Sequence, residues 1–135
     1  MGPREREATM QGDGTGAAIN YGDIFWVAAD EQIGSISGSP HPQVVVQDDV
    51  FNHSRIGTVV VCSLSSNLKR ASEPGVILLD AGEGGLERQS VVIASQVSSI
   101  SKDRLGERIG SLTSQRVDQI VAALRFLQAS HFRGR

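Results

Sequence analysis

The apolar positions of this chain fall into short β-type runs, followed by one stripe at helical spacing. Residues 24–28 are apolar on both alternating sets of positions, which predicts a strand buried on both faces. Residues 58–64 form the most continuous apolar run and predict a central strand. Shorter runs predict three more strands, at residues 44–46, 76–79 and 90–94. The glycine-rich residues 82–85 predict a hairpin turn between the last two.

The C-terminal part changes to helical periodicity. Its apolar stripe consists of Val117, Ile120, Val121, Leu124 and Leu127. Thr113 is the expected N-cap of this helix, and Leu112 is expected to pack against Val117 as a hydrophobic staple. A second, single helical turn is predicted to end at Asn52, with Asp48 or Asp49 as its cap.

The remaining segments indicate where the domain begins and ends. Residues 1–20 have no apolar period and are interpreted as a flexible leader, residues 21–129 as one domain, and residues 130–135 as a basic tail. The leader contains a Gly-x-Gly-x-x-Ala sequence, but a dinucleotide site would need a strand before it and a helix after it, and neither is expected there. Residues 34–42, rich in glycine, proline and serine, predict a loop. The fold class is mostly β: a small antiparallel barrel or roll with a C-terminal helix.

Composition narrows the possible classes of protein. The chain has 135 residues, of which 39% are hydrophobic and 21% charged, as in a globular domain. No apolar run approaches the length of a membrane helix, the N-terminus lacks a secretory apolar region, and Cys62 has no cysteine partner. We therefore expect no membrane association and a reducing cytoplasm, with Cys62 in the core.

Charge is distributed unevenly along the chain. The net charge of −2 argues against binding nucleic acid through bulk positive charge. Residues 1–65 nevertheless carry three basic and eight acidic side chains, whereas residues 66–135 carry ten basic and seven acidic ones. A local basic surface formed by residues 66–135 is therefore compatible with the net negative charge of the chain.

Few residues suggest chemistry directly. His41, His53 and His131 lack the spacing of metal ligands, so neither a metal nor another cofactor is expected. His41 lies between Pro40 and Pro42, which restrict its backbone, and an imidazole suits proton transfer near neutral pH. The alternative is a surface histidine without a role.

A polar and basic segment follows the predicted central strand. It consists of Ser65, Ser66, Asn67, Lys69 and Arg70. Hydroxyl, amide and cationic groups at a strand end can form a phosphate-binding surface. A solvated turn is the alternative, and on these residues alone it is the simpler explanation.

Together these segments resemble the MazF/PemK family of bacterial toxins. The similarity covers roughly residues 21–128 and rests on the order of several motifs. These are Gly22-Asp23-Ile24-Phe25-Trp26-Val27, Gly34-Ser35 through His41-Pro42 to Val46, Val60-Val61-Cys62-Ser63-Leu64-Ser65-Ser66, and Ser90-Val91-Val92 through Gln96-Val97 to Arg104-Leu105.

The resemblance implies an SH3-like barrel, a homodimer and the toxin component of a type II toxin–antitoxin system. It implies a metal-independent endoribonuclease that cleaves single-stranded RNA at short sequences. Attack of the ribose 2′-hydroxyl on the adjacent phosphorus would leave a cyclic phosphate, and a MazE-like antitoxin would block the groove. On this basis the expected catalytic residues are His41 and Ser65. The expected RNA-binding residues are Ser35, Ser37, Gln47, Ser66, Asn67, Lys69 and Arg70.

The chain departs from the family pattern at several positions of the expected site. His41 stands in place of the family arginine, Ser65 in place of a threonine and Ile36 in place of a glutamate. Ser63, Ser98 and Ser101 replace a proline, an arginine and an aspartate. Serine keeps the hydroxyl of threonine, whereas histidine exchanges a permanent bidentate cation for a titratable ring.

These departures leave two main hypotheses and one weaker one. The first is an active toxin in which His41 transfers a proton. The second is a catalytically silent homologue that still binds an antitoxin or RNA as a dimeric module. A gyrase poison of the related CcdB type is less well supported, because the chain lacks the Trp-Gly-Ile ending of that family.

Overall fold

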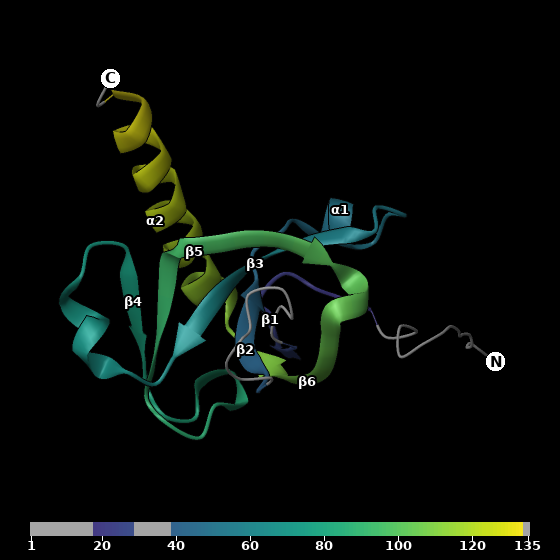
Figure 1. The fold of residues 1–135 in the computed structure, drawn as a ribbon, viewed down its shortest axis with the longest axis horizontal. Helices are drawn as coiled ribbons and strands as arrows, with labels where there is room; N and C mark the ends of the chain where they lie inside the picture. The colour runs from purple at the N-terminus through teal and green to yellow at the C-terminus, as the bar shows by residue number, and fades with distance from the viewer. Residues whose placement is uncertain (1–17, 29–38, 134–135) are drawn as a thin grey trace.

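A computed structural model describes residues 18–28 and 39–133, which form a six-stranded antiparallel sheet and a long C-terminal helix (Figure 1). The strands are β1 (Asp23–Val27), β2 (His41–Val45), β3 (Thr58–Ser65), β4 (Val76–Leu79), β5 (Ser90–Ser101) and β6 (Leu105–Ser111). The α-helices are α1 (Asp49–Asn52) and α2 (Ser114–Arg133). Three short 3-10 helices connect them: η1 (Leu68–Ser72), η2 (Glu83–Gly85) and η3 (Lys102–Arg104).

The strand order across the sheet is β4-β5-β3-β2-β1-β6, and every neighbouring pair is antiparallel. β3 lies between β5 and β2, which confirms the prediction of a buried central strand. The edge strands β4 and β6 do not pair with each other. Instead η2, in the β4–β5 connection, packs against β6, so the curled sheet is barrel-like without being a closed ladder.

The contact between η2 and β6 depends on glycine. A Cβ atom on Gly110 of β6 would collide with the carbonyl oxygen of Gly84 and lie 2.7 Å from its carbonyl carbon. Gly84 itself has φ +62, a conformation that glycine adopts at little cost. The two backbones can therefore approach more closely than side chains would allow.

Two apolar clusters lie on opposite faces of the sheet, and alternate residues of one strand contribute to different clusters. Ile24 and Val44 belong to the cluster beneath α2, whereas Phe25 and Val45 belong to the second cluster. Ile24, Phe25 and Val27 are buried, so the predicted burial on both faces is confirmed for the first part of residues 24–28, whereas Trp26 is 41% exposed and Ala28 lies beyond the strand and is exposed. Cys62 is fully buried in the first cluster, which confirms its prediction as a core residue.

Both predicted helices form with the predicted caps. The side chain of Asp48 accepts a 2.8 Å hydrogen bond from the backbone N–H of Val50, at the start of α1. The Thr113 hydroxyl accepts a 3.2 Å bond from the N–H of Arg116, at the start of α2. Leu112 and Val117 lie in the same buried cluster, as a hydrophobic staple requires.

The structure extends the predicted elements at several points. β5 continues to Ser101, β6 was not predicted, and α2 reaches Arg133, within the segment interpreted as a tail. Ile19 packs against the second apolar cluster, so the end of the segment interpreted as a leader contacts the domain. Among the described residues, no helix combines the length and apolar character needed to cross a membrane.

Candidate functional site

A groove of about 960 Å³ brings together segments that are distant in the sequence. It is lined by parts of β1, β2, the end of β3, η1, the β4–β5 connection, β5 and β6. Its lining includes four of the residues expected to form the site: His41, Ser65, Ser66 and Arg70. This is the surface that we consider as the functional site.

His41 begins a strand and does not lie in the predicted loop. It pairs with Val27 of β1, and Pro42 pairs with Trp26. The pairing of β2 with β3 starts only at Gln43, so Pro42 occupies a position paired on one side, where a missing N–H is tolerated. The strand pairing therefore fixes the backbone of His41 at the mouth of the groove, and its side chain is exposed.

Ser65 occupies the last position of β3. Its hydroxyl oxygen accepts a 3.0 Å hydrogen bond from the backbone N–H of Asn67. The hydroxyl proton remains available as a donor, because this contact uses an oxygen lone pair. Ser65 is half-buried, whereas Ser66 beside it is exposed.

Arg70 lies in the groove but is already paired. Its Nε lies 3.2 Å from both carboxylate oxygens of Glu73, and its terminal nitrogen lies 3.0 Å from Glu73 Oε1. The hydrogen bonds to Glu73 raise the pKa of Arg70 above its already high value. The predicted basic segment therefore contributes less free positive charge to the groove than its sequence suggested.

Two arginines that sequence reasoning missed also line the groove. Arg108 of β6 contacts the carboxylate of Asp23, with 3.3 Å between its Nε and Asp23 Oδ1, and donates a 2.7 Å bond to the Ser111 hydroxyl. Arg88 lies in the β4–β5 connection, and its guanidinium has no hydrogen-bond or ion-pair partner among the described residues. The only signal for either was the basic excess of residues 66–135.

Glutamine side chains also face this groove. Gln43 lies opposite Ser63 in the β2–β3 register, and both line the groove. Among the described residues, the buried Oε1 atom of Gln43 lacks a hydrogen-bond partner. A buried amide oxygen without a partner is costly, so this position is a local departure from a fully satisfied interior.

Other expected RNA-binding residues lie elsewhere or outside the described residues. The side chain of Gln47 donates to the Asn52 side chain at 2.9 Å and to the Thr58 carbonyl at 3.3 Å, away from the groove. Asn67 caps η1 by accepting a 3.2 Å bond from the N–H of Lys69, and neither residue lines the groove. Ser35 and Ser37 lie outside the described residues.

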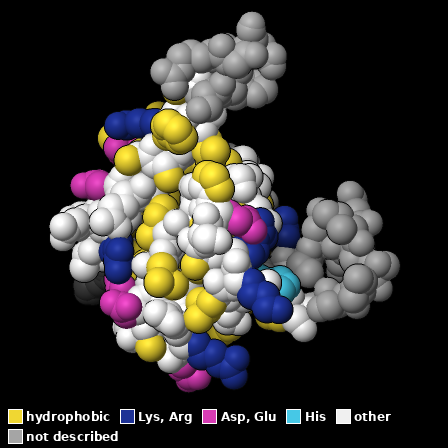
Figure 2. Space-filling view, turned by 90° about the vertical axis from the view of Figure 1, so that its left-hand side faces the viewer, with side chains coloured by type: hydrophobic (Ala, Val, Ile, Leu, Met, Phe, Trp, Pro, Cys, Tyr) yellow, Lys and Arg dark blue, Asp and Glu magenta, His cyan; other side chains and the backbone are white. Residues whose placement is uncertain are grey.

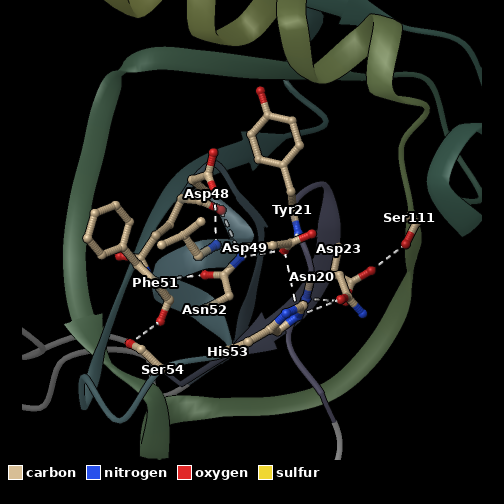
Figure 3. A network of polar contacts seen from close by, with 12 residues as sticks. Asn20, Tyr21, Asp23, Asp48, Asp49, Phe51, Asn52, His53, Ser54 and Ser111 are labelled. Atoms are coloured by element: carbon tan, nitrogen blue, oxygen red, sulfur yellow. Dashed lines mark hydrogen bonds and ion pairs between the residues drawn. The ribbon is translucent and has the colours of Figure 1, made fainter.

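A second polar cluster, around α1, has a structural explanation (Figure 3). Asp49 accepts hydrogen bonds from the Tyr21 N–H at 2.7 Å and from the Asn52 side chain at 3.0 Å. The bond from Asn52 is the main reason that the pKa of Asp49 lies below its ordinary value. His53 contacts Asn20 at 2.8 Å. These bonds tie α1 to the segment before β1, so the cluster is internally satisfied.

The described residues offer neither a cluster of metal ligands nor a reactive thiol. The described part of the chain contains no group of three or more His, Cys, Asp or Glu side chains arranged to hold a metal ion. Burial raises the pKa of Cys62 to about 12, so its thiol stays protonated and is a poor nucleophile. The groove itself presents the imidazole of His41 and the hydroxyl of Ser65, groups of the kind that transfer protons and donate hydrogen bonds.

Comparisons with known proteins show what the chain is similar to in sequence and fold. Residues 20–127 match the family described as "PemK-like, MazF-like toxin of type II toxin-antitoxin system". Endoribonuclease EndoA of Bacillus subtilis is 29% identical over 107 residues, covering 79% of this chain and 91% of the relative. Endoribonuclease MazF6 of Mycobacterium tuberculosis is 30% identical over 107 residues, covering 79% and 94%.

Solved structures share the fold. A MazE-MazF structure from Deinococcus radiodurans superposes with a TM-score of 0.70 at 21% identity, covering 84% of this chain and 97% of the other. A mycobacterial endoribonuclease in complex with its cognate antitoxin gives a TM-score of 0.67 at 21% identity, covering 83% and 96%.

Proposed function

The chain belongs to the family of PemK-like, MazF-like toxins of type II toxin–antitoxin systems, and from this premise we propose that it is a sequence-specific endoribonuclease. It cleaves single-stranded RNA in the groove without a metal ion. The observation that carries the proposal is the meeting of His41 and Ser65, from different strands, in one groove. Relatives named endoribonucleases, such as EndoA and MazF6, support it.

The proposed reaction is an internal transfer at one phosphodiester. The ribose 2′-oxygen forms a bond to the adjacent phosphorus while the bond from phosphorus to the 5′-oxygen of the next nucleotide breaks. The 2′-hydroxyl loses its proton and the departing 5′-oxygen gains one, which leaves a 2′,3′-cyclic phosphate and a 5′-hydroxyl. We assign one of these two proton transfers to His41.

Ser65 is proposed to bind the scissile phosphate. Its hydroxyl proton is free to point toward a non-bridging phosphate oxygen, because the contact with the Asn67 N–H uses only an oxygen lone pair. The end of β3 holds this hydroxyl in a fixed position, so little reorganisation is needed as negative charge develops.

We propose an antitoxin as the protein partner. Two solved relatives, from Deinococcus radiodurans and from a mycobacterial species, are complexes with an antitoxin. Figure 2 shows hydrophobic side chains beside Lys and Arg on the face that carries α2 and β4. Exposed apolar residues of this region are Leu68, Leu78 and Phe126. Such a face suits an acidic segment with apolar anchors.

A homodimer is proposed through the edge of β5. β4 pairs with β5 only from Ser90 to Ile93, and residues 95–99 of β5 are exposed throughout. This stretch contains no proline and no charged residue, the usual means of protecting a strand edge. Pairing of two such edges about a two-fold axis would cover both. Val97→Lys is expected to give a monomer by size exclusion with light scattering.

The direct test is RNA cleavage by the purified chain in the presence of a chelator. The parent protein is expected to cut single-stranded RNA at a short sequence, and His41→Ala is expected to be at least about 100-fold slower. Cleavage by His41→Ala at the parent rate would overturn the role of His41. Specific RNA binding without any cleavage would support the silent-homologue alternative. A cytoplasmic location is part of the same proposal, since cellular RNA is the substrate.

A further inference from the structure

Three arginine side chains line the groove, and they differ in whether their guanidinium groups already have hydrogen-bond or ion-pair partners. Arg70 is paired with Glu73, and Arg108 is held by Asp23 and Ser111. Arg88 has no side-chain partner among the described residues. It is therefore the arginine of this groove whose full set of donors is available to a ligand.

The backbone that carries Arg88 is fixed on both sides. The Ser90 hydroxyl donates a 3.0 Å hydrogen bond to the Arg88 carbonyl. Leu86, two residues earlier, is buried in the main apolar cluster, and its carbonyl accepts a 2.7 Å bond from the Gly82 N–H. Because the backbone is already anchored, only the side chain of Arg88 has to be ordered when it meets a ligand.

The acidic groups of the groove leave Arg88 free. Glu87 and Glu107 also line the groove, and neither forms an ion pair with Arg88. Asp23 and Glu73 are the carboxylates that already hold Arg108 and Arg70. An incoming anion at Arg88 therefore does not have to displace a carboxylate first.

The proposed reaction needs an unpaired cation at the scissile phosphate. Negative charge increases on the non-bridging oxygens as the 2′-oxygen bonds to phosphorus, and a permanent, bidentate cation stabilises that charge best. The imidazole of His41 transfers a proton and so cannot serve as a permanent cation throughout the reaction. The hydroxyl of Ser65 is a neutral donor.

We propose that Arg88 binds the non-bridging oxygens of the scissile phosphate and stabilises their charge in the transition state. This inference rests on the proposed function and deepens it, because it assigns the fixed positive charge of the same site. Arg88 acts together with His41 and Ser65 in the groove. The bonds that form and break are those already described for the internal transfer.

The test compares Arg88→Gln, Arg88→Lys and Arg125→Gln with the parent in single-turnover cleavage of one RNA. Arg125 is exposed on α2 and does not line the groove, so its variant removes the same charge elsewhere. Arg88→Gln is expected to be about 10²–10³-fold slower than the parent, with Arg88→Lys between them. Arg125→Gln is expected to stay within about twofold of the parent. Because Arg88 makes no side-chain bond, its variants are expected to match the parent in thermal unfolding.

A second measurement separates transition-state stabilisation from simple binding. The same RNA with a 2′-deoxy sugar at the cleavage site cannot react, so its dissociation constant reports ground-state binding. Arg88→Gln is expected to weaken that binding less than about tenfold, and much less than it slows cleavage. Equal losses in binding and in rate would overturn the assignment.

The outcomes distinguish the two proposals. If the parent cleaves RNA and Arg88→Gln cleaves as fast as Arg125→Gln, only the inference about Arg88 is wrong. If the parent cleaves no RNA, the proposed function fails and the inference fails with it. If Arg88→Gln does not fold, Arg88→Lys decides: a rate equal to that of the parent contradicts the need for a bidentate guanidinium.

Discussion

Asp23 and Arg108 form an ion pair across neighbouring strands, with 3.3 Å between Asp23 Oδ1 and Arg108 Nε. The Asp23 side chain is 2% exposed, whereas that of Arg108 is 52% exposed in the groove. The carboxylate also accepts hydrogen bonds from the Asn20 N–H at 3.0 Å and from the Ser111 hydroxyl. One buried group on β1 thus connects the start of the domain, β6 and the wall of the groove.

Replacing Asp23 by Asn is expected to lower the free energy of unfolding by about 2–3 kcal/mol, because buried donors lose a charged acceptor. Chemical denaturation followed by circular dichroism measures the change. Asp103→Asn is the control, since Asp103 is exposed and its carboxylate has no hydrogen-bond or ion-pair partner among the described residues. Equal stability of the two variants would contradict the structural role of Asp23.

Gly110→Ala is expected to destabilise the fold by about 2–3 kcal/mol, because the new methyl group meets the backbone of Gly84 and neither segment can move without breaking contacts. Gly57→Ala is a matched control, because a Cβ atom there has no other atom within 4 Å. Thermal unfolding of both variants measures the difference. A midpoint for Gly110→Ala equal to that of Gly57→Ala would show that the η2–β6 contact is looser than described.

The ion pair between Glu83 and Arg116 predicts a pH dependence of stability. Arg116 contacts both carboxylate oxygens of Glu83 at 2.8 Å, and these bonds are the main reason that the pKa of Glu83 lies below its ordinary value of 4.5. Because the folded pKa is depressed, the stabilisation is complete above about pH 4.5 and is lost as the pH falls through the folded value.

Glu83→Gln tests this dependence. The variant is expected to be about 1 kcal/mol less stable than the parent at pH 7. The difference is expected to shrink below pH 4.5, as Glu83 becomes protonated in the parent. Denaturant unfolding at a series of pH values measures both free energies. A difference that stays constant down to the lowest pH would show that the charge of Glu83 is not what stabilises this contact.

Ser65 predicts a contrast between two substitutions. Ser65→Ala removes the proposed phosphate donor and is expected to slow RNA cleavage by about 10²-fold or more. Ser65→Thr keeps the hydroxyl and is expected to remain within about tenfold of the parent. Single-turnover rates on one RNA provide the comparison. Equal rates for the alanine and threonine variants would remove Ser65 from the proposed mechanism.

The sequence predicted those strands and helices whose own apolar residues form a continuous run or a helical stripe. Strands with continuous apolar runs, such as β3, and the striped helix α2 were predicted because their residues report burial directly. β6 could not be predicted, since most of its residues are polar or glycine and it forms by pairing with β1. The same applies to the second half of β5, whose residues 95–99 are polar except for Val97.

The sequence pointed to groove-lining residues mainly where they stand next to recognisable strands. His41 and Ser65 flank apolar runs and carried the family resemblance. Arg88 and Arg108 reach the groove because η2 packs on β6 and β6 pairs with β1, and no local pattern encodes these contacts. Arg70 and Glu73 are three residues apart, a spacing that allows an ion pair. The sequence alone did not show whether Arg70 is paired or free.

The close approach of Gly84 and Gly110 also bears on the positions of two groove arginines. The β4–β5 connection with Arg88 forms one wall of the groove, and β6 with Arg108 contributes to another. The two glycine backbones touch next to Gly85 and Ile109, which line the groove. A methyl group on Gly110 would collide with the backbone of Gly84, so the spacing between these two segments depends on the missing side chain at position 110. An alanine there could be accommodated only by moving the β4–β5 connection, and Arg88 with it, relative to β6 and Arg108.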